Sequence, residues 1–139
     1  MINRSARYRV GVIGAGHICP FHLQALGRDT HCEVLGIFDL DRRQAEAVAG
    51  EYKIPRVYDA AESLMADADV IHVLTPPSTH TRLTLDALHH DCHVFVEKPL
   101  ATSVDDCERI IEMSRSVGRV VGVDHSLLLD PFTQKAQRL

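Results

Sequence analysis

The sequence predicts an α/β protein whose parallel sheet is doubly wound, which means that helices cover both of its faces. Three observations lead to this prediction. Strand-like and helix-like segments alternate along the chain, short connections join them, and the strand-like segments are continuous apolar runs, as in sheets that are buried on both faces. The length of 139 residues is enough for one domain with a substantial core.

Each element can be placed by its apolar pattern and by the residues at its ends. The expected strands are 8–13, 33–39, 70–75, 93–96 and 120–123, with a short edge strand at 56–58 behind Pro55. The expected helices are 18–26, 41–52, 60–65, 79–89 and 103–117. Most of them start beside an Asp, Ser or Thr that can cap the first turn, and Gly118 ends the last one. Numbered along the chain, the strands are expected in the order 3-2-1-4-5-6.

The sharpest local motif is the turn after the first strand, Gly14-Ala15-Gly16-His17-Ile18-Cys19. The first glycine allows a tight bend, and the second lets the backbone approach a diphosphate closely. The amides at the start of the following helix, around His17 and Ile18, then face the phosphates, whose charge the helix dipole favours. Cys19 replaces the third glycine of the G-x-G-x-x-G pattern, at a position that chiefly serves packing. The turn predicts a site for the pyrophosphate of a dinucleotide.

Asp39 lies at the end of the second strand, where an acidic side chain can accept hydrogen bonds from the ribose hydroxyls of adenosine. The alternative is that Asp39 only caps the helix that follows. A carboxylate at this place repels a 2'-phosphate, so NAD is expected as the cofactor in preference to NADP. Arg42 and Arg43 keep NADP open, because a guanidinium can pair with that phosphate, although both also suit a solvated first helical turn.

Two further segments follow core strands, Thr75-Pro76-Pro77-Ser78-Thr79-His80 and Glu97-Lys98-Pro99. Ligands of doubly wound folds bind outside the carboxyl ends of the strands, so both segments are expected on the same edge of the sheet as the glycine turn. The paired prolines end a strand and stiffen its loop, and Pro99 keeps Lys98 out of helical geometry. We expect this lysine to point toward the ligand crevice.

With these motifs in place, the sequence resembles the N-terminal domain of the Gfo/Idh/MocA family of NAD(P)-dependent oxidoreductases, which includes glucose-fructose oxidoreductase and inositol 2-dehydrogenase. The resemblance rests on Val12 to Gly16 with the following helix, on Asp39, on the loop from Thr75 to His80 and on Glu97-Lys98-Pro99. It covers essentially the whole chain. It implies a Rossmann-like fold in which the glycine loop binds the pyrophosphate and the strand-end acid binds ribose.

The resemblance also implies roles for the residues at the end of the expected strand 93–96. Lys98 would be the catalytic residue, lying beside the nicotinamide, orienting the substrate hydroxyl and assisting proton transfer as hydride moves. Glu97 would help to fix the lysine, the bond between Lys98 and Pro99 would be cis, and His80 would line the cofactor site. The full set of expected cofactor contacts is Gly14, Ala15, Gly16, His17, Ile18, Asp39, Thr75, Pro76, Pro77, His80, Glu97, Lys98 and Pro99. Without the resemblance, Lys98 and His80 resemble ordinary solvated residues.

Residues 1–124 are expected to form the dinucleotide-binding domain, and 125–139 to begin the crossover toward a C-terminal substrate domain that this chain lacks. Because half of the substrate site would be absent, hydride transfer from a sugar, cyclitol or related hydroxyl is expected to be slow or absent in this chain alone. Two alternatives stay open, a non-catalytic NAD(P)-sensing module and a truncated remnant whose turn, with Cys19, binds nothing. Apolar residues at 127–129 and Phe132 are candidates for self-association into a homo-oligomer.

Composition excludes several other classes of protein. Fifteen basic and nineteen acidic residues give a formal net charge of -4, and no basic run is longer than Arg42-Arg43, so nucleic acid is not expected as a partner. Residues 1–9 lack the apolar stretch of a signal peptide, and no apolar run is long enough to span a membrane. We therefore expect a cytoplasmic protein that acts on a small polyol or sugar and has no membrane partner.

Neither the cysteines nor the histidines predict a metal site. The four cysteines form no C-x-x-C pair and are expected as small packing residues. The cluster His89-His90-Asp91-Cys92-His93 falls at the edge of the sheet opposite the glycine turn, and adjacent side chains there point in different directions. His17 could contact phosphate, but His17 and His22 are both expected mainly to flank the turn.

Overall fold

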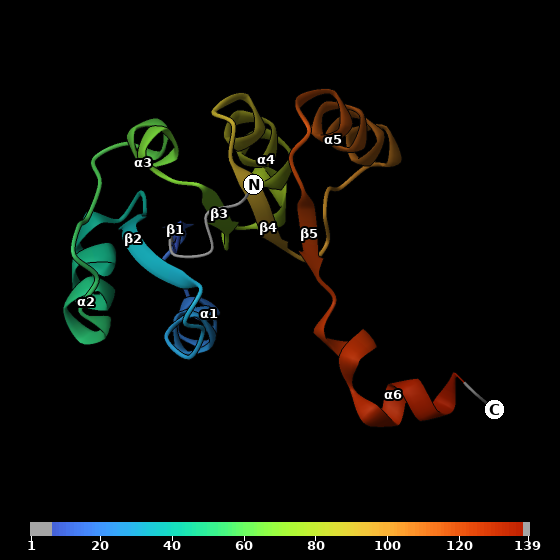
Figure 1. The fold of residues 1–139 in the computed structure, drawn as a ribbon, viewed down its shortest axis with the longest axis horizontal. Helices are drawn as coiled ribbons and strands as arrows, with labels where there is room; N and C mark the ends of the chain where they lie inside the picture. The colour runs from blue at the N-terminus through green and yellow to red at the C-terminus, as the bar shows by residue number, and fades with distance from the viewer. Residues whose placement is uncertain (1–6, 138–139) are drawn as a thin grey trace.

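Five parallel strands form the centre of the fold (Figure 1). They are β1 (Tyr8–Ile13), β2 (Cys32–Phe38), β3 (Val70–Val73), β4 (His93–Glu97) and β5 (Val121–Asp124), in the order β2-β1-β3-β4-β5. The structure is a computed structural model that describes residues 7–137, so the expected outer limits of the two domains, residues 1 and 139, lie outside the described residues. All neighbouring strands run parallel, which confirms the predicted fold class.

The predicted edge strand at 56–58 is not a strand, although it lies where the predicted order puts it. A single parallel bridge joins Val57 to Ile37 of β2, the strand at that edge of the sheet. The proline before this segment has no N–H to donate to a ladder, and the side chains of Arg56 and Tyr58 are directed to Asp67. The carbonyl of Arg56 and the N–H of Tyr58 both bond to Ile37, so the segment makes one bridge and no ladder, and five of the six predicted strands form.

Six α-helices accompany the sheet in the described part of the chain. They are α1 (Cys19–Leu26), α2 (Arg42–Tyr52), α3 (Ala61–Asp67), α4 (His80–His89), α5 (Val104–Val117) and α6 (Pro131–Ala136). Figure 1 shows α3, α4 and α5 on one side of the sheet, α1 and α2 on the other, and α6 apart from it at the C-terminal end. None of the helices between residues 7 and 137 is long and apolar enough to cross a membrane.

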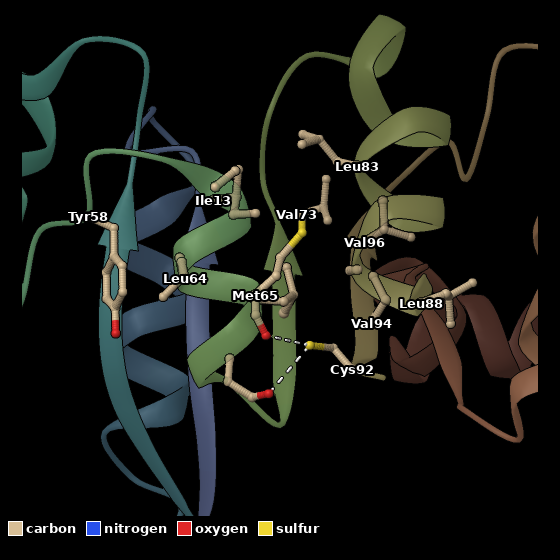
Figure 2. Packing of buried hydrophobic residues seen from close by; sticks show 14 residues of the cluster. Ile13, Tyr58, Leu64, Met65, Val73, Leu83, Leu88, Cys92, Val94 and Val96 are labelled. Carbon is tan, nitrogen blue, oxygen red and sulfur yellow. Dashed lines mark hydrogen bonds between the residues drawn. The ribbon is translucent and has the colours of Figure 1, made fainter. Parts of the chain in front are cut away.

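Each face of the sheet has its own core. The core beneath α3 and α4, drawn in Figure 2, includes Ile13, Leu64, Met65, Val73, Leu88, Val94 and Val96. The core beneath α1 and α2 includes Val12, Cys19, Leu23, Ile37 and Ala45. Val12 and Ile13 enter different cores because successive side chains of a strand point to opposite faces. The sheet is thus covered on both sides at its centre, as the apolar run of β1 predicted.

Capping residues set the starts of two helices, which begin one residue later than predicted. Asp41 accepts hydrogen bonds from the backbone N–H groups at positions 43 and 44 and so precedes α2. Ser103 accepts one from the N–H of Asp106 and precedes α5. Gly118, with a φ of 67°, ends α5 as predicted.

Candidate cofactor site

The glycine turn is closed at its first glycine and open at its second. Gly14 has a φ of 105°, and a Cβ atom there would lie 2.8 Å from the carbonyl carbon of Leu74, just past β3. Only glycine fits this position without strain. A Cβ atom at Gly16 would have nothing within 4 Å. The turn therefore packs tightly against the end of β3 while leaving backbone at Gly16 accessible.

Cys19 packs as the sequence predicted for the third position of the motif. Its side chain is fully buried in the core beneath α1, in the cluster that contains Val12 and Ala15. Burial raises the pKa of the Cys19 thiol to about 11, with a smaller contribution from the charge of Asp39. The thiol is therefore a small apolar packing group, and its replacement of glycine leaves the turn intact.

Asp39 ties the end of β2 to the glycine turn. One carboxylate oxygen accepts a hydrogen bond from the Ala15 N–H at 2.7 Å, and the other accepts from the Asp41 N–H at 2.8 Å. Asp41, and not Asp39, caps α2. Each oxygen of a carboxylate has two lone pairs, so each retains one for a ligand hydroxyl. Gln44, which the sequence analysis missed, donates to the Ala15 carbonyl at 2.8 Å and completes the clamp.

A hollow of about 190 Å³ lies in front of this clamp. Its lining includes Gly14, Gly16, Asp39, Gln44, Thr75 and Pro76. The structure thus brings the glycine turn, the strand-end acid and the proline-rich loop to one place. Of the other predicted contacts, His17 is exposed with its ring against Phe21, and Pro77 begins the short helical turn after the loop.

A smaller hollow of about 180 Å³ continues on the other side of Asp39 and is bordered by Arg42 and Asp59. The guanidinium of Arg42 is already paired there, because it donates to Glu46 at 2.7 Å and also to Asp59. These two partners raise the pKa of Arg42. Arg43 is exposed on the first turn of α2.

His80 lies behind the proline-rich loop instead of lining the hollow. Its side chain is fully buried, with one ring nitrogen 2.7 Å from the Thr75 carbonyl oxygen and the other 2.7 Å from the Pro99 carbonyl oxygen. Both partners are acceptors, and a neutral imidazole has a single N–H, so both contacts are hydrogen bonds only when the ring carries two protons. The alternative of a solvated histidine is therefore wrong, because the ring is enclosed between two loops, and the role of His80 at the cofactor site stays a prediction.

Glu97 contacts a histidine that the sequence analysis had placed only at the side of the turn. Its carboxylate lies 2.9 Å from Nε2 of the buried His22 on α1, and Asp124 lies 3.6 Å from the same nitrogen. Nδ1 of His22 lies 3.2 Å from Nδ1 of His72. Burial, and to a smaller extent the nearby His22, lowers the pKa of His72 to about 4, so this ring is neutral near pH 7. Lys98 itself is exposed, and its bond to the next proline is cis, as the resemblance implied.

The pairing of strand ends is the signal that could have revealed this group. Glu97 and Asp124 are the last residues of β4 and β5 and lie opposite each other in the parallel register. With His22, they bring three possible ligand atoms within 4.8 Å of one another, a spacing that could hold a metal ion and that the sequence did not predict.

His89 and His90 belong to the histidine cluster that was not expected to bind a metal. Their ring nitrogens contact carbonyl oxygens of α4, the helix that ends at His89.

Strand, glycine turn, helix, strand and acidic residue follow one another at the carboxyl ends of a parallel sheet, and this arrangement defines a dinucleotide-binding domain of the Rossmann type. The comparison with known families agrees with this class. The Gfo/Idh/MocA family, described as an oxidoreductase family with an NAD-binding Rossmann fold, matches residues 8–125. The chain belongs to this family.

The proteins that this chain is similar to include two dehydrogenases and a ketoreductase. Inositol 2-dehydrogenase 3 of Saccharopolyspora erythraea is 38% identical over 113 residues, which cover 80% of this chain and 33% of that protein. The structure of UDP-N-acetylglucosamine 3-dehydrogenase from Acidithiobacillus ferrooxidans has a TM-score of 0.86 at 28% identity, covering 95% of this chain and 43% of the other. A 3-ketoreductase from Actinomadura kijaniata, solved with NADP and TDP-benzene, has a TM-score of 0.87 at 26% identity, covering 94% and 41%. The chain thus spans well under half the length of these relatives.

Proposed function

We propose that this chain is the cofactor-binding domain of an NAD(P)-dependent oxidoreductase that transfers hydride between the cofactor and a sugar or cyclitol hydroxyl. The contrast between the two glycines carries the proposal. Gly14 is closed by the backbone of Leu74, whereas Gly16 is open and borders the hollow beside Asp39. An open backbone at the start of a helix is what the close approach of a pyrophosphate requires. The substrate class follows from the names of the relatives, which act on inositol and on a UDP-linked sugar.

The residues present fit such a cofactor, which would supply the carbon that accepts or gives up hydride. The backbone amides of Gly16, His17 and Ile18, which precede α1, would hold the pyrophosphate, because the amides of Ala15 and Cys19 already donate within the chain and Pro20 has no N–H. Asp39 would accept hydrogen bonds from ribose hydroxyls through its remaining lone pairs. Thr75 and Pro76 form the facing wall of the hollow. Lys98, exposed at the end of β4, holds the substrate hydroxyl and receives its proton, which places general acid–base chemistry at Nζ.

We also propose that the chain prefers NAD to NADP. A 2'-phosphate would approach the carboxylate of Asp39, which is held in place by the Ala15 N–H. The guanidinium of Arg42, which borders the smaller hollow beside Asp39, is already paired with Glu46 and Asp59, so its charge is largely compensated. A 2'-phosphate would therefore meet three carboxylates there, whereas a free 2'-hydroxyl can donate a hydrogen bond to Asp39.

Titration of the purified chain with NADH and NADPH, followed by nicotinamide fluorescence, tests the cofactor proposal. Gly16→Ala is the informative variant, because the structure has room for its methyl group but a bound pyrophosphate would not. We expect Gly16→Ala to keep the wild-type unfolding midpoint and to lose about tenfold or more in NADH affinity, as loss of close phosphate contacts should produce. Gly50→Ala, which is equally open, is the control. Equal NADH affinity in Gly16→Ala and the wild-type chain would contradict the proposal.

Other parts of the proposal have support of a different kind. A remnant whose turn binds nothing is disfavoured, because Cys19 is accommodated in the core and Gly16 stays open. A cytoplasmic location agrees with the free state of all four cysteines. Self-association agrees with the exposure of Leu127 and Leu128, and the absence of nucleic acid partners stays a prediction.

A further inference from the structure

A buried histidine holds each neighbour of Lys98. On one side, Nε2 of His22 lies 2.9 Å from the carboxylate of Glu97. On the other side, Nδ1 of His80 lies 2.7 Å from the carbonyl oxygen of Pro99. The two histidines are 7% and 0% exposed, whereas the lysine between their contacts is exposed. The backbone at Lys98 is therefore fixed from both sides while its side chain stays free.

His22 also lies beside two carboxylates, those of Glu97 and Asp124. Glu97 and Asp124 face the same nitrogen, and their side chains are only 14% and 24% exposed. Among the described residues, His22 is the basic side chain that lies within 4.0 Å of each carboxylate, at 2.9 Å and 3.6 Å. Half-buried carboxylates that lose such a partner repel each other and are poorly hydrated. Without His22, we expect the ends of β4 and β5 to move apart, and Lys98 with them.

The contact through His80 joins two loops at the same edge of the sheet. The ring spans the carbonyl of Thr75, which borders the cofactor hollow, and the carbonyl of Pro99. The two ring nitrogens lie 2.7 Å from these two carbonyl oxygens, so the ring is wedged between the loops, and a neutral ring donates a hydrogen bond to one of the two. A displacement of the Thr75 loop would therefore be passed through one rigid ring to the residue after Lys98.

We propose that His22 and His80 are positioning residues that couple the place of Lys98 to the two segments that hold the cofactor. His22 belongs to α1, which follows the glycine turn, and His80 begins α4, which follows the Thr75 loop. Each histidine thus links one wall of the cofactor site to one neighbour of the lysine. The role of Lys98 in proton transfer rests on the function proposed above, but the coupling itself can be measured without turnover.

Lysine reactivity provides that measurement, because the chain has only three lysines, Lys53, Lys98 and Lys135. The chain is treated with a limiting amount of an acetylating N-hydroxysuccinimide ester, and peptide mass spectrometry gives the rate at each site. The ratio of the acetylation rate at Lys98 to that at Lys53 reports on the surroundings of Lys98. The ratio is independent of differences in reagent concentration between samples. Lys135 serves as a second internal reference.

The variants are His22→Gln and His80→Gln, which keep a polar side chain but replace a rigid ring, whose two nitrogens each lie beside a partner, with a single flexible amide. His93→Gln is the matched control, because His93 also forms a hydrogen bond, with the Val120 N–H at 3.0 Å, but at the opposite end of β4. Circular dichroism and urea unfolding establish that each variant is folded. If the His22 variant does not fold, the ratio is measured in Glu97→Gln instead, which alters the partner of His22. If the His80 variant does not fold, the ratio is measured in Thr75→Gly, which loosens the loop that His80 contacts.

We expect the Lys98 ratio to rise by about threefold to tenfold in each histidine variant, the range that loss of one hydrogen bond can produce, and to stay at the wild-type value in His93→Gln. We also expect saturating NADH to lower the ratio in the wild-type chain and to lower it less in the variants. Ratios in His22→Gln and His80→Gln that match the His93→Gln control would overturn the coupling. A wild-type chain that does not bind NADH would instead count against the proposed function, and the ratios without NADH would still decide the coupling.

Discussion

Gly14 and Gly16 are residues of one kind, two positions apart, yet the fold constrains only the first. Gly14 combines a φ of 105° with backbone 2.8 Å from a hypothetical Cβ atom, whereas Gly16 has open space. Stability and ligand binding are therefore separable in this turn. The same sequence motif contains one position that the folded chain needs and one position that only a bound ligand would need.

Gly14→Ala should consequently destabilise the chain. The substitution adds a clash with the backbone at Leu74 and an unfavourable φ, so we expect a loss of about 2–4 kcal/mol in the free energy of unfolding, measured by urea denaturation. Gly50→Ala in α2 should be neutral or stabilising by about 0.5–1 kcal/mol, because it lies in a helix with free space around it. A Gly14→Ala variant as stable as Gly50→Ala would show that the turn relaxes.

His72 should make the stability depend on pH. Its pKa falls from 6.5 to about 4 on folding, so the unfolded chain binds the extra proton between these pH values and the folded chain does not. The free energy of unfolding therefore decreases as the pH is lowered through this window, by at most about 3 kcal/mol. Urea denaturation at a series of pH values measures this slope. His72→Asn should flatten it, whereas His89→Gln, at an exposed site, should leave it unchanged.

The thiols should divide into two classes. Burial raises the pKa of Cys19 and of Cys92 to about 11, whereas Cys32 and Cys107 are only partly buried. We expect iodoacetamide at about pH 8 to modify Cys107 in the folded chain and to leave Cys19 and Cys92 untouched, because the thiolate is the reactive species. Peptide mass spectrometry identifies the sites. All four should react in urea, and modification of Cys92 before Cys107 would contradict the packing shown in Figure 2.

At the scale of elements, the starts of α2 and α5 are fixed by single side chains. Ser103→Ala removes the acceptor for the Asp106 N–H at the start of α5 and should lower the free energy of unfolding by about 1 kcal/mol. Ser116→Ala, in the last turn of the same helix, removes bonds to the carbonyl oxygen and the sulfur of Met113 and should have little effect. Thermal unfolding of the two variants side by side separates a cap from an ordinary helical serine.

Elements were predictable from the sequence where the signal is local. Apolar runs and glycine turns placed the five strands that form and most of the helices, and the carboxyl ends of parallel strands brought Gly16, Asp39 and Thr75 together as expected. The segment 56–58 was predicted as a strand from a short apolar pattern, but its pairing with β2 stops after a single bridge at Ile37, which such a short pattern does not reveal. His22 and His80 escaped because their contacts join residues 75 and 19 positions apart, which periodicity does not record.

At the scale of the whole molecule, the helices cover the two faces of the sheet unequally. A hollow of about 530 Å³ lies between α1 and the face of the sheet that carries His72 and Phe95. Leu127 and Leu128, beyond β5, are 74% and 53% exposed. The side chains of Leu129 and Phe132, which the sequence analysis grouped with them, lie outside the described residues. Exposed apolar groups of this kind favour association.

We therefore expect the chain to associate with itself in a concentration-dependent way. Sedimentation velocity over a range of concentrations measures the association. The double substitution Leu127→Glu and Leu128→Glu should weaken it, because charged side chains resist burial in an interface. Val104→Glu, at an exposed apolar site at the start of α5, is the control. Association that is unchanged in the double variant would place the interface elsewhere.

The alternation of side chains along β4 has a consequence for how this protein can change. Val94 and Val96 enter the core beneath α4, while Phe95 and Glu97 point to the side of α1. Inserting one residue into this strand would exchange the two sets and carry a carboxylate into an apolar core. The number of residues in β4 thus determines on which face of the sheet Lys98 leaves the strand. We therefore expect a single-residue insertion to be tolerated less well in β4 than in the loops around it.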